Sequence, residues 1–162
     1  MKITSDNDNI SSGKLPRALY KLTINGEPTG SVSRNGNRMI KVHYYIVDIC
    51  VDKKDGLEWV IGVPITDYVL VEQGKHQKLE SLLRSLKVNI NNVEFNDITG
   101  EPTFEVDETT GQSIPITFNG KEVYAICESV PIPITDDFGN PIRSPEEGIA
   151  INGYRHQIVR YV

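Results

Sequence analysis

The sequence has few of the residues that build metal and cofactor sites. Two cysteines, three histidines and one tryptophan occur among its 162 residues. Cys50 and Cys127 both lie in apolar, strand-like runs, so we expect small buried side chains in a reducing compartment. No Cys/His cluster has the spacing of metal ligands. These scarcities predict a protein without a metal site and without a cofactor.

Long apolar runs are also missing. No stretch approaches the roughly 20 apolar residues of a transmembrane helix. The opening MKITSDNDNISSGK has no apolar segment of the kind found in secretory signals. We therefore expect no membrane association and a cytoplasmic location. The length and a hydrophobic content of 38% are typical of one domain with a real core.

Positive charge is scarce overall, because the formal net charge is −5. A strongly basic composition, the simplest mark of a nucleic-acid-binding domain, is therefore absent. The charges are unevenly placed, however. Residues 16–41 contain five basic residues and one acidic residue, whereas residues 94–108 contain six acidic residues and no basic one. Because the local field governs affinity for phosphate, this distribution still allows a basic surface on one side.

The common catalytic motifs are absent as well. The sequence has no Gly-x-Ser-x-Gly elbow, no Walker loop and no His-Glu-x-x-His. The pairs Asp136-Asp137 and Glu146-Glu147 are adjacent residues, which point in opposite directions on an extended chain. The acidic segment 97–107 lacks the dense ligand spacing of a calcium loop. We expect no enzyme and no catalytic residue; a metal-dependent nuclease that uses the acidic loops is the weaker alternative.

What the sequence does have is a long β-favouring run, RMIKVHYYIVDICV, at residues 38–51. It contains no Gly or Pro, and its β-branched and aromatic residues suit a half-buried strand. Alternation divides it into an apolar face (Ile40, Val42, Tyr44, Ile46) and a basic-aromatic face (Met39, Lys41, His43, Tyr45, Val47). A strand with one apolar face and one basic-aromatic face is what a curved binding sheet needs. The alternative is that Lys41 and His43 only meet water and that Tyr45 fills a second core.

The rest of the chain predicts a mainly β protein with one helix. Leu79, Leu82, Leu83 and Leu86 form the stripe of an amphipathic helix over residues 74–88. We expect a flexible arm at 1–14 and one domain at 15–162. Further strands are expected at 18–25, 57–63 (with Trp59), 121–130 and 154–162. The first two strands should pair antiparallel across a loop or hairpin connection at 26–37, and 65–71 either extends the third strand or is irregular. A hairpin at 104–106 and 113–118 and a long loop at 131–153 complete the prediction.

This order of elements is that of an OB-fold, a five-stranded Greek-key barrel with a helix before the fourth strand. The phrases LPRALYKLTI, NGNRMIKVHYYIVD, GKEVYAICESV and NGYRHQIVRYV resemble those of phage single-stranded DNA-binding proteins, over most of residues 14–162. The resemblance implies sequence-tolerant binding of single strands in phage DNA replication, recombination or repair. It also implies the host cytoplasm as location and replication or recombination proteins as partners. Many such proteins end in an acidic tail, which this sequence does not show.

Binding of a single strand requires cations for the phosphates and flat side chains on which bases stack. The candidate nucleic-acid-binding residues are Lys21, Arg34, Arg38, Lys41, His43, Tyr45, Trp59, Tyr154 and Arg155. Packing is the alternative role for Trp59 and Tyr154, and loop solubility for Arg34 and Arg38. An exposed final strand would also allow a homo-oligomer by edge addition. A function of another class stays open: a non-enzymatic, all-β structural or interaction module of a phage assembly, whose acidic loops contact another protein.

Overall fold

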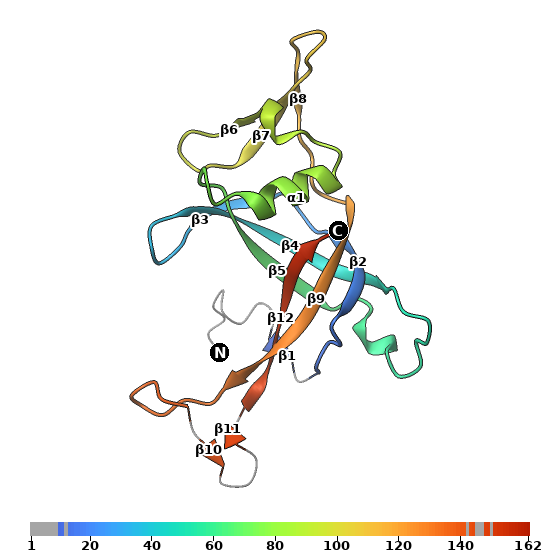
Figure 1. The fold of residues 1–162 in the computed structure, drawn as a ribbon, viewed down its shortest axis with the longest axis vertical. Coiled ribbons are helices and arrows are strands. Elements are labelled where there is room, and N and C mark those ends of the chain that lie inside the picture. Colours follow the sequence, from blue (N-terminus) through green and yellow to red (C-terminus); the bar gives the residue numbers. More distant parts are fainter. Residues whose placement is uncertain (1–9, 12, 142, 145–147, 150) are drawn as a thin grey trace.

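The computed structural model describes residues 10–11, 13–141, 143–144, 148–149 and 151–162. The strands are β1 (Ile10–Ser11), β2 (Ala18–Ile24), β3 (Thr29–Val32), β4 (Arg38–Ile49), β5 (Pro64–Leu70), β6 (Val93–Phe95), β7 (Pro102–Val106), β8 (Ser113–Pro115), β9 (Glu122–Pro133), β10 (Arg143–Ser144), β11 (Gly148–Ile149) and β12 (Ile151–Tyr161). One α-helix, α1 (Gln77–Ser85), and two short 3-10 helices, η2 (Glu58–Val60) and η3 (Ile90–Asn92), accompany them in this part of the chain. The expectation of a mainly β protein is confirmed (Figure 1).

The main sheet is antiparallel, with the strand order β1-β12-β9-β2-β4-β3, and β5 pairs with β4. Strands β2 and β3 pair with successive parts of β4, opposite residues 44–49 and 38–41. The predicted antiparallel pairing of the first two strands is therefore confirmed. The connection between them is a hairpin that contains β3, and only residues 33–37 form its turn.

Alternation along the strands builds the core. The apolar face predicted for residues 40–46 is buried, as are Tyr20, Leu22 and Ile24 of β2. Helix α1 buries Leu79, Leu82 and Leu83, each contributing roughly 1.5–3 kcal/mol through removal of apolar surface from water. The helix contacts both β5 and β12, and these two strands also contact each other. The main sheet therefore curves around a core that α1 covers.

A buried hydrogen-bond network joins the helix to the sheet. The Asp67 carboxylate on β5 accepts hydrogen bonds from the Lys78 ammonium (2.8 Å) and the Tyr161 hydroxyl (2.7 Å). The Tyr161 hydroxyl in turn lies 2.6 Å from that of Tyr44, and Lys78 also donates to the Ile158 carbonyl (2.8 Å). Burial raises the pKa values of Tyr44 and Tyr161 well above those of an exposed tyrosine. Charge-assisted bonds of this kind hold β4, β5, α1 and β12 in one arrangement.

The predicted third strand, 57–63, is wrong. Residues 58–60, which include Trp59, form η2, and the strand lies at Pro64–Leu70 instead. Gly62 adopts a φ of 86°, a left-handed conformation that glycine tolerates and that interrupts an extended chain. Proline is accepted as the first residue of a strand because its missing N–H is not needed there. The strand therefore starts directly after the turn.

Other predicted boundaries also shift. The helix is shorter than 74–88 at both ends: it begins at Gln77, after Gly74 with a φ of 87°, and it ends before Lys87, which has a φ of 62°. Strand β9 continues to Pro133 and β12 already begins at Ile151, so the predicted loop 131–153 is partly strand. The predicted hairpin near 104–118 corresponds to β7 and β8, but the sequence did not indicate β6, which completes a second, three-stranded sheet.

At the N-terminal side, β1 pairs with Tyr154 and Arg155 of β12. Residues 1–9 and 12 of the expected flexible arm lie outside the described residues. The division into an arm at 1–14 and a domain at 15–162 stays a prediction. No helix in the described ranges has the length and apolar character needed to cross a bilayer.

Candidate nucleic-acid interface

Three of the candidate residues lie together on the side of β4 that faces away from the core. Lys41 and His43 are half-buried there, and Tyr45 is 39% exposed. Pairing with β5 places Tyr68 opposite Lys41 and Thr66 opposite His43. We call this surface, made of Lys41, His43, Tyr45, Thr66 and Tyr68, the outer face of β4–β5. It combines one lysine, one imidazole and two phenol rings on adjacent strands.

Contacts across the strand pair orient these side chains. The Lys41 Nζ atom lies 5.7 Å from the centroid of the Tyr68 ring, a distance at which the ring attracts the cation. The His43 Nδ1 atom lies 2.9 Å from Thr66 Oγ1, which restrains the imidazole. A surface whose rings are held in place loses little conformational entropy when bases stack on it.

Sequence reasoning missed Tyr68, because residues 65–71 were left open as either an extension of the third strand or an irregular segment; the strand alternative is the one observed, as β5. In the observed strand, Ile65 and Val69 are buried while Tyr68 is half-buried on the opposite face. Alternation within residues 65–70 was therefore the signal that pointed to Tyr68. A second exposed aromatic that was missed, Tyr124 of β9, lies opposite Lys21 of β2.

Lys21 extends the basic character to β2, next to β4 in the sheet. Its Nζ atom lies 3.5 Å from Glu122 Oε1, and its Cα pairs with that of Asp48. The pKa of the Asp48 carboxyl is lowered, mainly by its hydrogen bond with Lys54 and to a smaller extent by the charge of Lys21. Acidic neighbours therefore compensate part of the charge of Lys21.

The two arginines of the hairpin differ in their surroundings. Arg34 is exposed in the turn at 33–37. The Arg38 guanidinium donates from Nε to Glu72 (3.0 Å) and from Nη1 to the Asp97 carbonyl (3.0 Å). The bond from Nε and a further one from the Arg38 backbone N–H hold the pKa of the Glu72 carboxyl below its usual value. Arg38 thus connects the hairpin to two other segments, whereas Arg34 extends toward solvent.

The remaining three candidates are not on β4 or β5 but on η2 and β12. Trp59 is in η2, partly exposed, and its ring packs against the Gly13 backbone so closely that a Cβ there would come within 2.9 Å of ring carbons. Tyr154 and Arg155 lie on β12, which β9 and β2 separate from β4 in the pairing order. The structure therefore gathers Lys41, His43 and Tyr45, with Lys21 nearby. Tyr154 and Arg155 lie on a strand with two other strands between it and β4 in the pairing order, whereas Trp59 lies in η2, which contacts β4.

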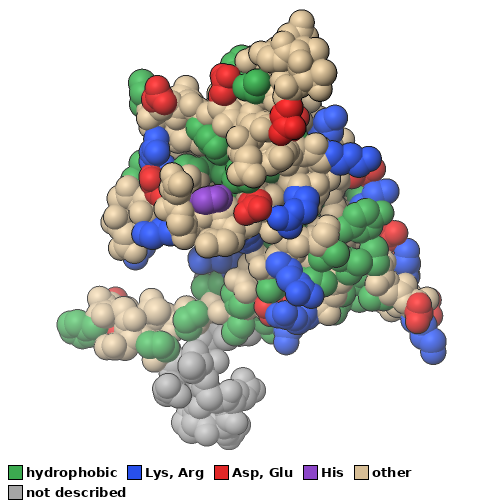
Figure 2. All heavy atoms as spheres, turned by 45° about the horizontal axis from the view of Figure 1, so that its top comes forward, with side chains coloured by type: hydrophobic (Ala, Val, Ile, Leu, Met, Phe, Trp, Pro, Cys, Tyr) green, Lys and Arg blue, Asp and Glu red, His purple; other side chains and the backbone are tan. Residues whose placement is uncertain are grey.

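Two projections flank the strands on one side of the molecule. Figure 1 shows the end of the β3–β4 hairpin and the segment after β9 extending toward the same side. On the face drawn in Figure 2, basic and acidic side chains are interspersed. Any binding of phosphate on this face would therefore depend on individual lysines and arginines.

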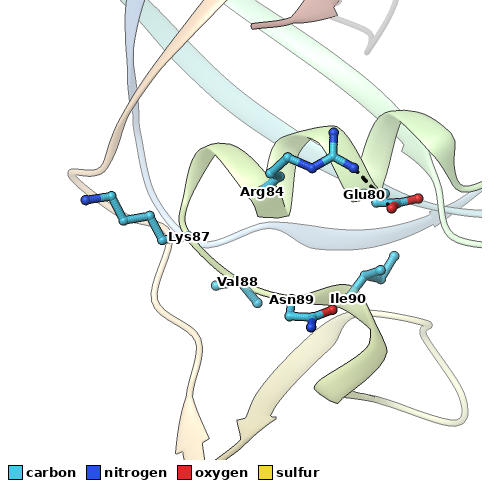
Figure 3. Close-up of a pocket in the computed structure, with 6 residues that line it drawn as sticks. All are labelled: Glu80, Arg84, Lys87, Val88, Asn89 and Ile90. Atoms are coloured by element: carbon cyan, nitrogen blue, oxygen red, sulfur yellow. Dashed lines mark hydrogen bonds and ion pairs between the residues drawn. The ribbon is translucent and has the colours of Figure 1, made fainter.

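The described segments contain no group of three or more His, Cys, Asp or Glu residues that would hold a metal ion. They do contain a cavity of about 290 Å³ at the C-terminal end of α1. It is lined by Glu80, Arg84, Lys87, Val88, Asn89 and Ile90 (Figure 3). None of these residues belongs to the outer face of β4–β5, so the cavity is a separate feature.

No protein-family model matches the chain, and no curated protein matches it either. The features that bear on function are the antiparallel β architecture and the side chains grouped on the outer face of β4–β5.

Proposed function

We propose that the protein is a non-enzymatic, sequence-tolerant single-stranded DNA-binding protein and that DNA lies on the outer face of β4–β5. The observation that carries the proposal is the grouping of Lys41, Tyr45 and Tyr68 on paired strands. Stacking of a base on an aromatic side chain contributes roughly 1–3 kcal/mol and tolerates any base. Two phenol rings with neighbouring lysines therefore suit single strands of mixed sequence.

The fold that we propose is of the OB type, with β2, β4, β5, β9 and β12 as its five strands. Three observations support it: the pairing order β12-β9-β2-β4-β5, the helix between β5 and β9, and the contact between β5 and β12. OB-folds bind oligonucleotides on the second and third strands, between the first and fourth connections. In this assignment those strands are β4 and β5, and the connections are the two projections of Figure 1.

The basic residues contribute phosphate contacts in this arrangement. Lys41 lies on the face itself, Lys21 lies on the adjoining strand, and Arg34 lies at the end of the β3–β4 hairpin. The resemblance to phage single-stranded DNA-binding proteins supplies the proposed setting in phage replication, recombination or repair. From the same resemblance we propose that proteins of replication or recombination are its partners.

The test is a fluorescence titration of a labelled oligo-dT with the whole protein, repeated over a range of salt concentrations. We expect binding that weakens with salt, with a logarithmic slope of roughly −0.7 for each phosphate contact. A duplex of the same length should compete poorly, because its bases are not free to stack. Absence of binding to oligo-dT at low salt would contradict the proposal and favour the protein-interaction module as the function.

A further inference from the structure

The segment after β9 ends in an ordered acidic tip that presents a phenyl ring. Thr135 and Pro141 pair as an antiparallel bridge, and we call residues 134–141 the hairpin arm. At its tip the Asp136 carboxylate accepts hydrogen bonds from the backbone N–H groups of Phe138 and Asn140, both at 2.9 Å. Gly139 supplies the left-handed turn with a φ of 83°. The tip is therefore held in shape by its own hydrogen bonds.

Phe138 packs against little of the part of its own chain that the structure describes. Its side chain is 90% exposed, although burial of a phenylalanine is worth roughly 1.5–3 kcal/mol. The neighbouring carboxylates of Asp136 and Asp137 make the tip acidic, so phosphates would be repelled from it. An apolar ring with acidic neighbours suits an apolar pocket with a basic rim.

The cavity at the end of α1 has these properties. Val88 and Ile90 supply apolar walls, and Arg84 and Lys87 carry positive charge around them (Figure 3). Glu80 is paired with Arg84 at 3.1 Å, and the Glu105 carboxylate accepts a hydrogen bond from the Asn89 N–H (2.9 Å). Lys87 is therefore the basic residue of the lining that the Glu80–Arg84 pair does not include. The depression is open to solvent and has a volume of about 290 Å³, which leaves space for a phenyl ring.

The backbone at the helix end gives this cavity a defined shape. The Val88 N–H donates to the Leu83 carbonyl (2.8 Å) and the Lys87 N–H donates to the Arg84 carbonyl (2.9 Å), which is the bonding of a Schellman motif. Lys87 occupies the left-handed position that glycine usually takes, with a φ of 62°. Its charge also suits the negative end of the helix dipole.

We propose that Phe138 of one copy inserts into the α1 cavity of a second copy of this chain, with Asp137 facing Lys87 of that copy. Size and charge are complementary between the two surfaces. Figure 1 places the hairpin arm and α1 at opposite parts of the molecule, so the arm does not fill the cavity of its own chain. The contact joins two different surfaces and is therefore heterologous. It does not depend on the proposed binding of DNA.

Association of the protein alone tests this contact. One aromatic anchor with one or two ion pairs makes a small interface, so we expect an apparent Kd on the order of 100 µM. Sedimentation equilibrium without DNA, from about 10 µM to about 1 mM, should show an apparent mass that rises with protein concentration. The rise should weaken at high salt because ion pairs contribute. A constant monomer mass over this range would overturn the proposal.

Two variants locate the contact. Phe138→Ala removes the ring, and the double variant Arg84→Glu/Lys87→Glu reverses the rim charge; each should weaken association at least about tenfold, a loss of 1.4 kcal/mol or more. The matched control for the ring is Ile98→Ala, because Ile98 is 87% exposed elsewhere. The control for the charge is Lys14→Glu/Lys53→Glu, which makes the same change at two other exposed lysines. Circular dichroism checks that all four remain folded.

A mixing experiment distinguishes this contact from non-specific association. The Phe138→Ala protein keeps an intact cavity, and the Arg84→Glu/Lys87→Glu protein keeps an intact arm. At about 100 µM, each alone should stay largely monomeric, whereas an equimolar mixture should form a heterodimer with one intact contact. Association that survives either variant, or a mixture that stays monomeric, would overturn the proposed contact.

Discussion

The ammonium group of Lys41 lies 5.7 Å from the centroid of the Tyr68 ring, across the pairing of β4 and β5. The two side chains come from strands whose residues are far apart in the sequence, yet they form one basic-aromatic pair. His43, held 2.9 Å from Thr66 Oγ1, and Tyr45 continue the same face. This arrangement of a cation beside ordered rings is the basis for the proposed binding of single strands.

Loss of one ring or one charge from the outer face of β4–β5 should weaken binding in different ways. Tyr45→Ala should raise the Kd for oligo-dT by roughly 5- to 150-fold at all salt concentrations, because one stacked base is lost. Lys41→Ala should instead reduce the salt slope by roughly 0.7, because one phosphate contact is lost. The matched controls are Phe95→Ala, which removes an exposed ring on β6 of the second sheet, and Lys53→Ala. If both test variants bind as tightly as the parent protein, the assigned face is wrong.

The two hairpin arginines should behave differently when replaced. Arg38→Ala should lower the Tm, because the bonds to Glu72 and Asp97 connect the hairpin to other segments. The pKa of Glu72 is lowered by Arg38. This stabilisation is therefore present above the pKa that Glu72 has in the unfolded chain, and it is lost as the pH falls through the lower folded value. Arg34→Ala should leave the Tm unchanged and weaken oligo-dT binding.

Thermal unfolding of both arginine variants from pH 7 to pH 3 would check this expectation. The difference in Tm between the parent and Arg38→Ala should shrink toward low pH. An equal difference at all pH values would contradict the role of the Glu72 charge.

Removal of Asp67 should be among the most destabilising single changes. Asp67→Ala leaves the Lys78 ammonium and the Tyr161 hydroxyl without their carboxylate partner in a largely buried place. Breaking a buried ion pair in this way costs roughly 3–5 kcal/mol. Urea unfolding should therefore show a large decrease in the free energy of unfolding.

A double-mutant cycle isolates the ion pair. Lys78→Met removes the cation, so the double variant Asp67→Ala/Lys78→Met should lose less stability than the sum of the two single variants. Additive losses would mean that the two side chains do not stabilise the fold as a pair.

Acid should destabilise the protein partly through His156. The side chain is buried, and its Nδ1 atom lies 2.7 Å from Ser129 Oγ, which also accepts a hydrogen bond from the Leu15 N–H (2.7 Å). Burial lowers the pKa of His156 below its ordinary value of 6.5. The unfolded chain therefore binds more protons, so stability is complete above pH 6.5 and decreases as the pH falls below it.

Urea unfolding at pH 7.5, 6 and 5 would measure this effect. We expect a smaller decrease in His156→Gln than in the parent over the same pH range, since the variant has no group to protonate at that position. An identical decrease in both proteins would exclude His156 as a source of the acid sensitivity.

Local periodicity alone was enough to predict the strand at 38–49 and helix α1. Alternation in residues 38–49 and the leucine stripe of α1 were recognisable because each pattern repeats within one element. The burial of Tyr44 and the outward position of Tyr45 follow from that alternation. The grouping of Lys41, His43 and Tyr45 on one face was therefore predictable from the amino-acid sequence.

Tertiary structure decided between residues 57–63 and residues 65–71 as the third strand, and it decided which ring joins that group. The run LEWVIGV at 57–63 is apolar enough to suggest a strand, whereas PITDYVL at 64–70 contains an aspartate in a core-facing position. A buried aspartate is tolerable only because Lys78 from α1 and Tyr161 from β12 meet it. These partners come from distant parts of the chain. Alternation within residues 65–70 is compatible with a strand, but periodicity describes only neighbours along the chain. It could not show that distant partners of Asp67 make residues 64–70 the strand that brings Tyr68 beside Lys41.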